Sequence, residues 1–201
     1  MASDVRMIVV TGGPCAGKTT AMSWLREDLQ RRGWVVLFAS EVATELITGG
    51  VAPWTCASIP SFQHSVFELQ LGKERAYLSA ARAMEAERVM VVCDRGLPDC
   101  RSYLTREEYQ AILDDFGMTE AQARDRYDAV FHLVTAAKEA PEFYTLANNQ
   151  ARRETIEEAA ALDDRLIAAW EGHPQLRVIG AFAAFDEKML RLMREVDAFL
   201  G

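Results

Sequence analysis

The segment TGGPCAGKTT, residues 11–20, gives the strongest indication of the fold of this chain. It matches the pattern G-x-x-x-x-G-K-[S/T], with Gly12 at its start and Gly17-Lys18-Thr19 at its end. Glycines in this pattern let successive backbone N–H groups turn toward phosphate oxygens, and the lysine brings a positive charge to the outer phosphates. A plain glycine-rich turn is the competing interpretation, and the flanking sequence decides between the two.

The flanking residues place this segment between a strand and a helix. Residues 5–11 form a short apolar run with β-branched side chains, which is typical of a buried strand. From Lys18 to Arg32 apolar side chains recur on one helical face, and Gly33 follows as a stop signal. The segment would then open a helix whose positive N-terminal dipole also faces the anion. The sequence therefore predicts a phosphate-binding loop made of Gly12, Gly13, Pro14, Cys15, Ala16, Gly17, Lys18, Thr19 and Thr20.

Strands and helices alternate along the rest of the chain. Further apolar runs indicate strands at residues 34–40, 88–94, 128–135 and 175–181. Helices are expected at 63–86, 152–170 and from Phe185 to the C-terminus, with a loop or lid at 51–62. Such alternation produces a parallel sheet covered by helices on both faces. We therefore expect one α/β domain over residues 1–201, a three-layer P-loop NTPase with a five-stranded parallel sheet.

The composition and charge of the chain argue against nucleic acid and membranes as binding partners. The chain has 201 residues, a formal net charge of −8 and no basic run. It lacks the clustered lysines and arginines that bind nucleic acid or an anionic membrane surface. No apolar run approaches the ~20 residues that span a bilayer, and the first residues do not resemble a signal peptide. The four cysteines have no metal-ligand spacing. We expect a soluble cytoplasmic protein that binds neither nucleic acid nor a membrane.

Asp94, which ends the expected strand 88–94, is the predicted magnesium residue. P-loop proteins hold Mg²⁺ between a hydroxyl of the loop, here Thr19, and an acidic residue at the end of a neighbouring strand. Arg95 follows, where mechanical ATPases usually place a glutamate that orients water. An arginine near the phosphates stabilises developing charge without activating water, so this pattern favours phosphoryl transfer over hydrolysis.

Transfer to a hydroxyl needs a base near the acceptor, and Glu41 is the first candidate. It follows the second strand, at the carboxyl end of the sheet where open α/β sheets bind ligands. Glu45, one helical turn later, is the second candidate. Either glutamate could instead be a first-turn acid that complements the dipole of its helix.

A lid is expected at about residues 136–155, because Arg152 and Arg153 open a helix after a polar loop. Small kinases carry a lid there, and its arginines close on the phosphates and exclude water. A solvated arginine pair in a glutamate-rich helix is the competing interpretation. Asp163, later in the same helix, is expected to be a solvated charge or a pairing partner. His132 alternates with apolar strand residues and is expected to be a core histidine.

Five stretches of the chain resemble a family of small P-loop proteins that are described as AAA-like ATPase domains and are related to the ribosylnicotinamide-kinase domain. They are TGGPCAGKTT, SEVATELITGG, DRGLPDCRSYL, RYDAVFHLVTAA and EFYTLANNQARRETIEEAAALDDRLIAAWEGHP. The resemblance implies a nucleoside- or nucleotide-kinase-like fold that binds ATP or GTP with Mg²⁺. By position, it implies that the loop from Gly12 to Thr20 binds phosphates and that Asp94 serves the metal. It also implies that Glu41 faces the acceptor and that Arg152 or Arg153 acts from the lid.

Two functions follow from these patterns. The first is a magnesium-dependent phosphotransferase that moves the γ-phosphate of ATP or GTP to a hydroxyl of a small molecule, using Lys18, Glu41, Asp94, Arg95, Arg152 and Arg153. The alternative is a nucleotide-binding switch, similar to an ATPase or GTPase, that acts on a protein partner through residues 51–62 or an acidic surface. A mechanical ATPase fits poorly, because no glutamate follows Asp94. The acceptor, the preferred nucleotide, the identity of the base and the oligomeric state, with a homodimer as one option, stay open.

Overall fold

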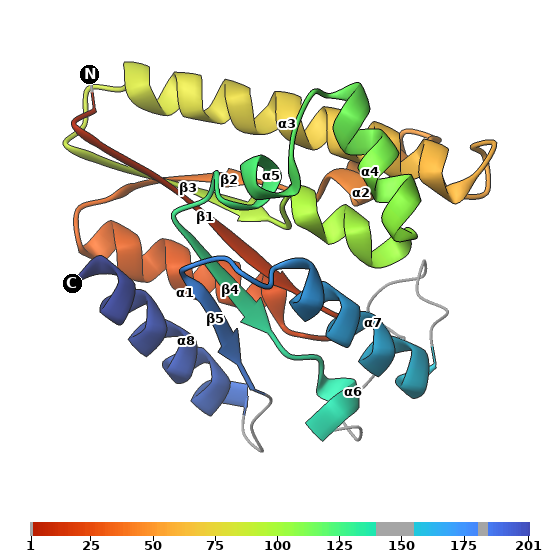
Figure 1. Ribbon diagram of the computed structural model, residues 1–201. Helices are drawn as coiled ribbons and strands as arrows, with labels where there is room; N and C mark the ends of the chain where they lie inside the picture. The colour runs from red at the N-terminus through yellow and green to blue at the C-terminus, as the bar shows by residue number, and fades with distance from the viewer. Residues whose placement is uncertain (1, 140–154, 181–184) are drawn as a thin grey trace.

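A computed structural model describes residues 2–139, 155–180 and 185–201 of the chain. Its centre is a sheet of five parallel strands in the order β2-β3-β1-β4-β5 (Figure 1). The strands are β1 (Asp4–Gly12), β2 (Val35–Ala39), β3 (Arg88–Asp94), β4 (Ala129–Leu133) and β5 (Leu176–Ile179). The structure confirms the predicted α/β class and the five-stranded parallel sheet, because every apolar run that indicated a strand forms one.

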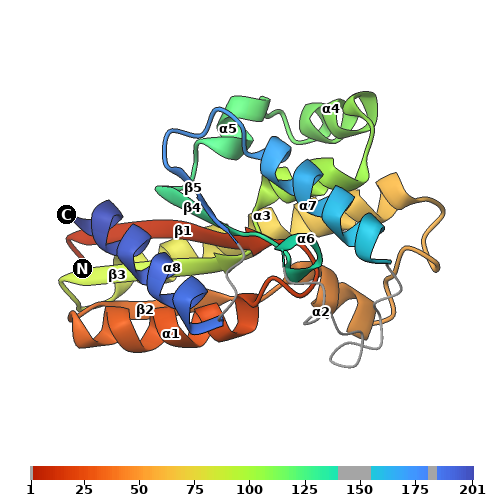
Figure 2. The same cartoon turned by 90° about the horizontal axis from the view of Figure 1, so that it is seen from below.

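Helices cover both faces of the sheet, so the predicted three layers are also confirmed (Figures 1 and 2). On one face lie α1 (Lys18–Arg31) and α8 (Phe185–Leu200). On the other lie α3 (Ile59–Ala83) and α7 (Ile156–Ala169). The shorter elements are α2 (Val42–Thr48), the 3₁₀ helix η1 (Leu97–Tyr103), α4 (Arg106–Asp115), α5 (Glu120–Arg124) and α6 (Ala136–Glu139).

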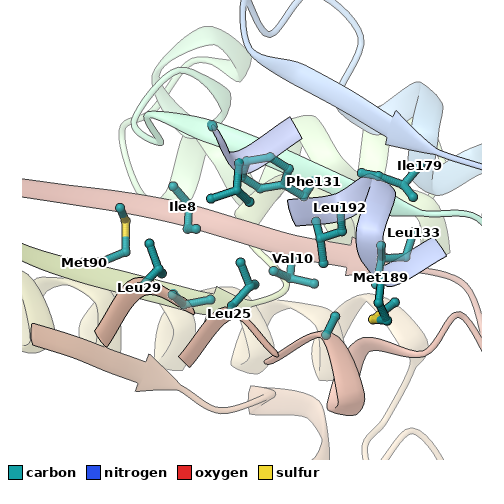
Figure 3. Close-up of a cluster of buried hydrophobic side chains, with 14 of the residues drawn as sticks. Ile8, Val10, Leu25, Leu29, Met90, Phe131, Leu133, Ile179, Met189 and Leu192 are labelled. Carbon is teal, nitrogen blue, oxygen red and sulfur yellow. The ribbon is translucent and has the colours of Figure 1, made fainter. Parts of the chain in front are cut away.

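The strand side chains alternate between two apolar cores. Ile8 and Val10 of β1 point to the face covered by α1 and α8, where they pack with Leu25, Leu29 and Leu192 (Figure 3). Each of these five side chains is completely buried, and a buried leucine or isoleucine contributes about 1.5–3 kcal/mol relative to an exposed one. This core holds α1 against β1, and the loop between those two elements, residues 13–17, is the middle of the segment 11–20.

The other face of β1 carries Met7 and Val9, which pack beneath α3 and α7. Tyr127 and Trp170 belong to the same core, with ring centroids 5.3 Å apart in an edge-to-face arrangement. A third apolar cluster, around Phe67, joins α3 to η1, α4 and α5. These contacts fix the segment that follows β3 beside the carboxyl end of the sheet.

The expected start of one helix needs correction, and most of the expected lid lies outside the described residues. The helix expected from residue 63 begins at Ile59, because Ser58 accepts a hydrogen bond from the Ser61 amide and Pro60 suits a first helical turn. The loop expected at 51–62 is therefore shorter. Most of the expected lid at about 136–155, including Arg152 and Arg153, lies outside the described residues. None of the helices in the described ranges has the length and hydrophobicity of a transmembrane span.

Candidate functional site

The chain requires glycine at the end of β1, where the loop to α1 begins. Gly12 has φ +147°, and a Cβ atom there would lie 2.2 Å from the backbone oxygen of Leu133 in β4. The loop therefore leaves the sheet in direct contact with the next strand. Gly17, at φ +89°, is the N-cap of α1 and has no capping side chain. The first amides of α1 consequently point into the loop without a side-chain partner at the cap, as an anion site at a helix N-terminus requires.

Lys18 and Thr19 are the first two residues of α1. The Lys18 ammonium turns back over the loop and lies 3.4 Å from the Gly12 carbonyl oxygen, a long hydrogen bond. Thr19 is exposed. The sequence motif predicts both residues from their spacing to the glycines. In the structure, α1 begins at Lys18, so both side chains extend from the first turn of that helix.

The Gly13 amide has a different partner from the one that a phosphate-binding loop suggests. Its N–H donates to Asp163 Oδ1 of α7 at 2.9 Å, so its hydrogen bond joins the loop to α7. The same oxygen lies 3.0 Å from His132 Nε2, and Lys138 lies 2.9 Å from Asp163 Oδ2. Burial alone would raise the pKa of Asp163, but His132, Lys138 and the Gly13 N–H outweigh it and lower that pKa to about 2. Asp163 is thus an ionised, completely buried pairing partner.

Asp94 lies at the end of β3, level with Val10 of β1 and hence beside the start of the loop. Its Oδ1 atom is buried and has no hydrogen-bond partner among the described residues. Burial raises the pKa of Asp94, although the nearby charge of Lys18 acts against that rise. A buried carboxylate oxygen without a partner is costly, and a bound cation would remove the cost.

These features fit a magnesium ion. Within residues 2–139, 155–180 and 185–201, no three His, Cys, Asp or Glu side chains gather as a metal cluster. Mg²⁺ does not need such a cluster, because it usually keeps several waters and binds one or two protein oxygens together with nucleotide phosphates. Asp94 and the Thr19 hydroxyl are the two protein groups that would hold it.

Arg95 and Glu41 form an ion pair between the ends of β3 and β2. Arg95 Nε lies 2.7 Å from Glu41 Oε1, and the Thr44 hydroxyl donates to Glu41 Oε2 at 2.7 Å. Burial would raise the pKa of Glu41, but the charges of Arg95 and Lys18 outweigh it and lower that pKa to about 2. The charges of Lys18, Glu41, Asp94 and Arg95 act on one another, so the structure brings these four predicted residues together.

Glu45, the other candidate base, lies in a separate group of residues. It is paired with Lys73 of α3 and accepts a hydrogen bond from the Ser40 hydroxyl. The hydrogen bond from Lys73 lowers the pKa of Glu45. Glu45 is therefore an acidic residue in the first turn of α2 that forms a surface ion pair. Glu41 is the glutamate that interacts with the loop residue Lys18.

Asp99, which no sequence pattern singled out, connects three parts of the site. Its Oδ1 accepts hydrogen bonds from the Thr11 hydroxyl at 2.7 Å and from Trp170 Nε1 at 3.1 Å. Its Oδ2 accepts from the Gly96 amide at 2.8 Å. Asp99 therefore ties the end of β1 to the turn after Arg95 and to the end of α7. The only local signal was an acidic residue three positions after Gly96, which is the spacing of a helix capping box.

Helix α8 also contacts the loop through residues that the sequence did not single out. The buried Lys188 ammonium donates to the Ala16 carbonyl at 2.8 Å and to the Val134 carbonyl at 2.5 Å. The ring of Phe185 lies against Gly17, because a Cβ atom on Gly17 would be 2.6 Å from Phe185 Cε2. Three elements, namely α1, α7 and α8, thus fix the shape of the loop.

The chain matches a known family of proteins. No curated protein matches the chain significantly. A family model described as an AAA domain matches residues 7–188, which include the loop, Glu41, Asp94 and Arg95. That range covers most of the 201 residues and contains four of the five strands whole, together with β1 from residue 7 onward. The chain therefore belongs to this family of AAA domains and is a nucleotide-binding P-loop protein.

Proposed function

We propose that this protein is a magnesium-dependent phosphotransferase that moves the γ-phosphate of ATP or GTP to a hydroxyl group of a small molecule. The observation that carries the proposal is the ion pair between Arg95 and Glu41 beside Lys18 and Asp94. Arg95 directly follows Asp94, the proposed metal residue, and pairs with Glu41, which follows β2. This arrangement supports charge stabilisation at a transferred phosphoryl group.

The ion pair keeps the Glu41 carboxylate ionised and only weakly basic. A general base works best when its pKa lies near the working pH, and Glu41 has a pKa of about 2. Its carboxylate stays ionised and accepts hydrogen bonds, which suits the orientation of a hydroxyl group. Phosphoryl transfer passes through a loose transition state that depends mainly on positioning and charge stabilisation. A weakly basic, well-oriented carboxylate therefore supports transfer to a bound hydroxyl.

The other protein groups take roles around this pair. The loop from Gly12 to Thr20 would bind the triphosphate, with Lys18 at its outer end. Asp94 and Thr19 would hold Mg²⁺, which neutralises charge on the phosphate oxygens when it is bound. Arg152 and Arg153 are proposed to complete the site from a lid. The chain would form one domain, and it would work in the cytoplasm.

Phosphorus NMR of the protein with MgATP or MgGTP tests the proposal. A pooled set of nucleosides, sugars and amino alcohols would serve as acceptors. The expected result is a nucleoside diphosphate together with a new phosphoester and little free phosphate. Lys18→Ala should abolish the turnover, and unchanged turnover in that variant would exclude this site. Free phosphate that appears regardless of the pool would identify a hydrolase and contradict the role of Arg95.

A nucleotide-binding switch is the second candidate, and one surface feature favours it. The side chain of Trp54 is 71% exposed, and Val51 and Ile59 beside it in the chain are also exposed. Two of these exposed apolar residues lie between α2 and α3 and the third begins α3, and together they could contact a protein partner. Tight nucleotide binding with no consumption in the presence of any acceptor would favour the switch over the phosphotransferase.

A further inference from the structure

Glu74 is a buried carboxylate that the proposed chemistry does not use. It lies in the middle of α3, and its side chain has no exposed surface. Its Oε1 accepts hydrogen bonds from the Tyr127 hydroxyl at 2.7 Å and from Gln70 Nε2 at 2.8 Å. Its Oε2 lies 3.1 Å from Arg126 Nε. Burying an ion pair of this kind rarely improves stability over apolar packing, so its presence calls for another reason.

The hydrogen bonds that start at Glu74 end on the backbone at both sides of Gly96. Gln70 Nε2 also donates to the Arg95 carbonyl at 3.3 Å. On the other side, the Leu97 amide donates to the Tyr127 hydroxyl at 2.8 Å. Because Gln70 and Tyr127 both donate to one carboxylate oxygen, Glu74 fixes the two side chains relative to each other. Through these hydrogen bonds, Gln70 and Glu74 of α3 fix the turn that follows β3.

Gly96 itself is packed against the same group. A Cβ atom on Gly96 would lie 2.8 Å from the Trp170 ring and 2.9 Å from the Tyr127 ring and hydroxyl. The turn therefore has little freedom to move toward the second apolar core. Tyr127 limits its position both by hydrogen bonding and by contact.

This support matters because Arg95 has an unfavourable backbone. Its φ is +71°, a left-handed conformation that residues other than glycine adopt only when their surroundings impose it. The Arg95 amide donates to the Val10 carbonyl at 3.1 Å, which holds one side of the residue. Gln70 holds its carbonyl on the other side. The backbone in turn sets the direction of the guanidinium group toward Glu41.

We propose that Glu74, Gln70 and Tyr127 are positioning residues for Arg95, which hold residues 95–97 so that the guanidinium group is directed at the transferred phosphoryl group. The use of Arg95 in transfer rests on the function proposed above. The competing explanation is that this polar cluster only stabilises the fold. The two explanations predict different results when the Tyr127 hydroxyl is removed. Positioning predicts weaker binding only of a ligand that mimics the transferred phosphoryl group, whereas a purely structural role predicts no such selectivity.

Tyr127→Phe is the sharpest variant, because it removes the hydroxyl that bonds both Glu74 and Leu97 and leaves the ring in place. Tyr109→Phe is the matched control, since Tyr109 is also buried but belongs to the cluster of α3, η1 and α4. Calorimetry would measure the affinity for MgADP alone and for MgADP with aluminium fluoride, which mimics the transferred group. In Tyr127→Phe we expect the MgADP affinity to stay within about twofold and the aluminium fluoride complex to weaken about tenfold, as for other groups that orient a ligand-binding side chain. Tyr109→Phe should change neither affinity.

A double-mutant cycle with Arg95→Ala separates positioning from general stability. If Tyr127 acts through Arg95, Tyr127→Phe should have no further effect on the aluminium fluoride complex once Arg95 is alanine. An equal loss in both backgrounds, or an equal loss for MgADP alone, would overturn the proposal. A wild-type protein without turnover would count against the phosphotransferase, but the cycle would still decide what positions Arg95. Should Tyr127→Phe fail to fold, Gln70→Met removes the bond to the Arg95 carbonyl at similar volume and should give the same selective loss.

Discussion

Asp163 Oδ1 lies 2.9 Å from the Gly13 nitrogen, although 150 residues separate the two in the chain. The contact joins the phosphate-binding loop to the middle of α7. Asp163 also accepts a hydrogen bond from the Thr135 amide at 3.3 Å and pairs with Lys138. The buried charge of Asp163 therefore fixes the loop to α7. The position of α7 and the shape of the loop depend on each other.

Asp163→Asn should destabilise the protein in a pH-dependent way. The folded pKa of Asp163 is about 2, below its ordinary value of 3.8, so the ionised group favours folding above pH 4. That contribution is about 2 kcal/mol from the size of the shift, and it disappears as the pH falls from about 4 to 2. Chemical denaturation across this range should show a steep acid limb in the wild type and a flatter one in the variant.

Asp164→Asn is the control for that measurement. Asp164 is 72% exposed and also pairs with Lys138, at 2.7 Å. A surface ion pair contributes at most about 1 kcal/mol, so this variant should keep the acid limb of the wild type. Equal acid limbs in all three proteins would mean that the buried contact to Gly13 does not stabilise the fold.

Gly12→Ala should prevent correct formation of the loop. The new Cβ atom would lie 2.2 Å from the Leu133 carbonyl oxygen, and φ +147° is strained for alanine. We expect a loss of about 3 kcal/mol or more in the free energy of unfolding. Gly72→Ala is the opposite control: nothing lies within 4 Å of its Cβ position in α3, so it should stabilise by about 0.5–1 kcal/mol. Thermal unfolding of both variants measures the contrast, and similar melting temperatures would contradict the close approach.

Glu41→Gln tests the acceptor side of the site. Loss of the charge would free Arg95 and remove an oriented acceptor, so we expect turnover to fall about 100-fold with nearly unchanged nucleotide affinity. Because the pKa of Glu41 is about 2, wild-type turnover should lose no activity to protonation of this group between pH 5 and 8. Glu45→Gln, which changes the glutamate paired with Lys73, should leave turnover within about twofold. The reverse ranking would make Glu45 the acceptor-side residue.

The site residues that could be predicted from the sequence are those whose neighbours in the chain define them. Lys18 follows from loop spacing, while Asp94 and Glu41 follow from strand ends, which meet at one edge of a parallel sheet. Asp99, Glu74 and Asp163 could not be predicted in the same way. Each of them has a partner far away in the chain, for example Thr11, which lies 88 residues from Asp99. Periodicity reports which face of a helix is buried, and it contains no information about which polar group meets a buried carboxylate.

The start of α3 was predicted wrongly for a local reason. The two prolines of residues 51–62, Pro53 and Pro60, and the lack of a helical period indicated a loop, because proline removes a hydrogen-bond donor inside a helix. In the first helical turn that donor has no partner within the helix, so proline is favourable there. Only the Ser58 cap, whose hydroxyl accepts from the Ser61 amide at 3.2 Å, distinguishes the two cases.

Asp94→Asn should separate stability from metal binding. Burial raises the pKa of Asp94 in the folded state, so the charged form opposes folding once the pH exceeds its ordinary value of 3.8. An asparagine removes that penalty, and we expect the metal-free variant to be at least as stable as the wild type at pH 7. At one hundred times its dissociation constant, MgATP should stabilise the wild type by about 2.7 kcal/mol, and removal of Mg²⁺ with EDTA should remove most of this effect.

In Asp94→Asn, ATP should stabilise the protein equally with and without Mg²⁺. Asp115→Asn, at a carboxylate that is 68% exposed, should behave like the wild type in both measurements. Melting temperatures with ATP, with MgATP and with EDTA distinguish the outcomes. A variant that is less stable without metal would show that the Asp94 carboxylate stabilises the fold, and a variant that keeps the full Mg²⁺ effect would place the metal elsewhere. The combination of equal or higher stability with a lost metal response is expected only if the buried oxygen is kept for the cation.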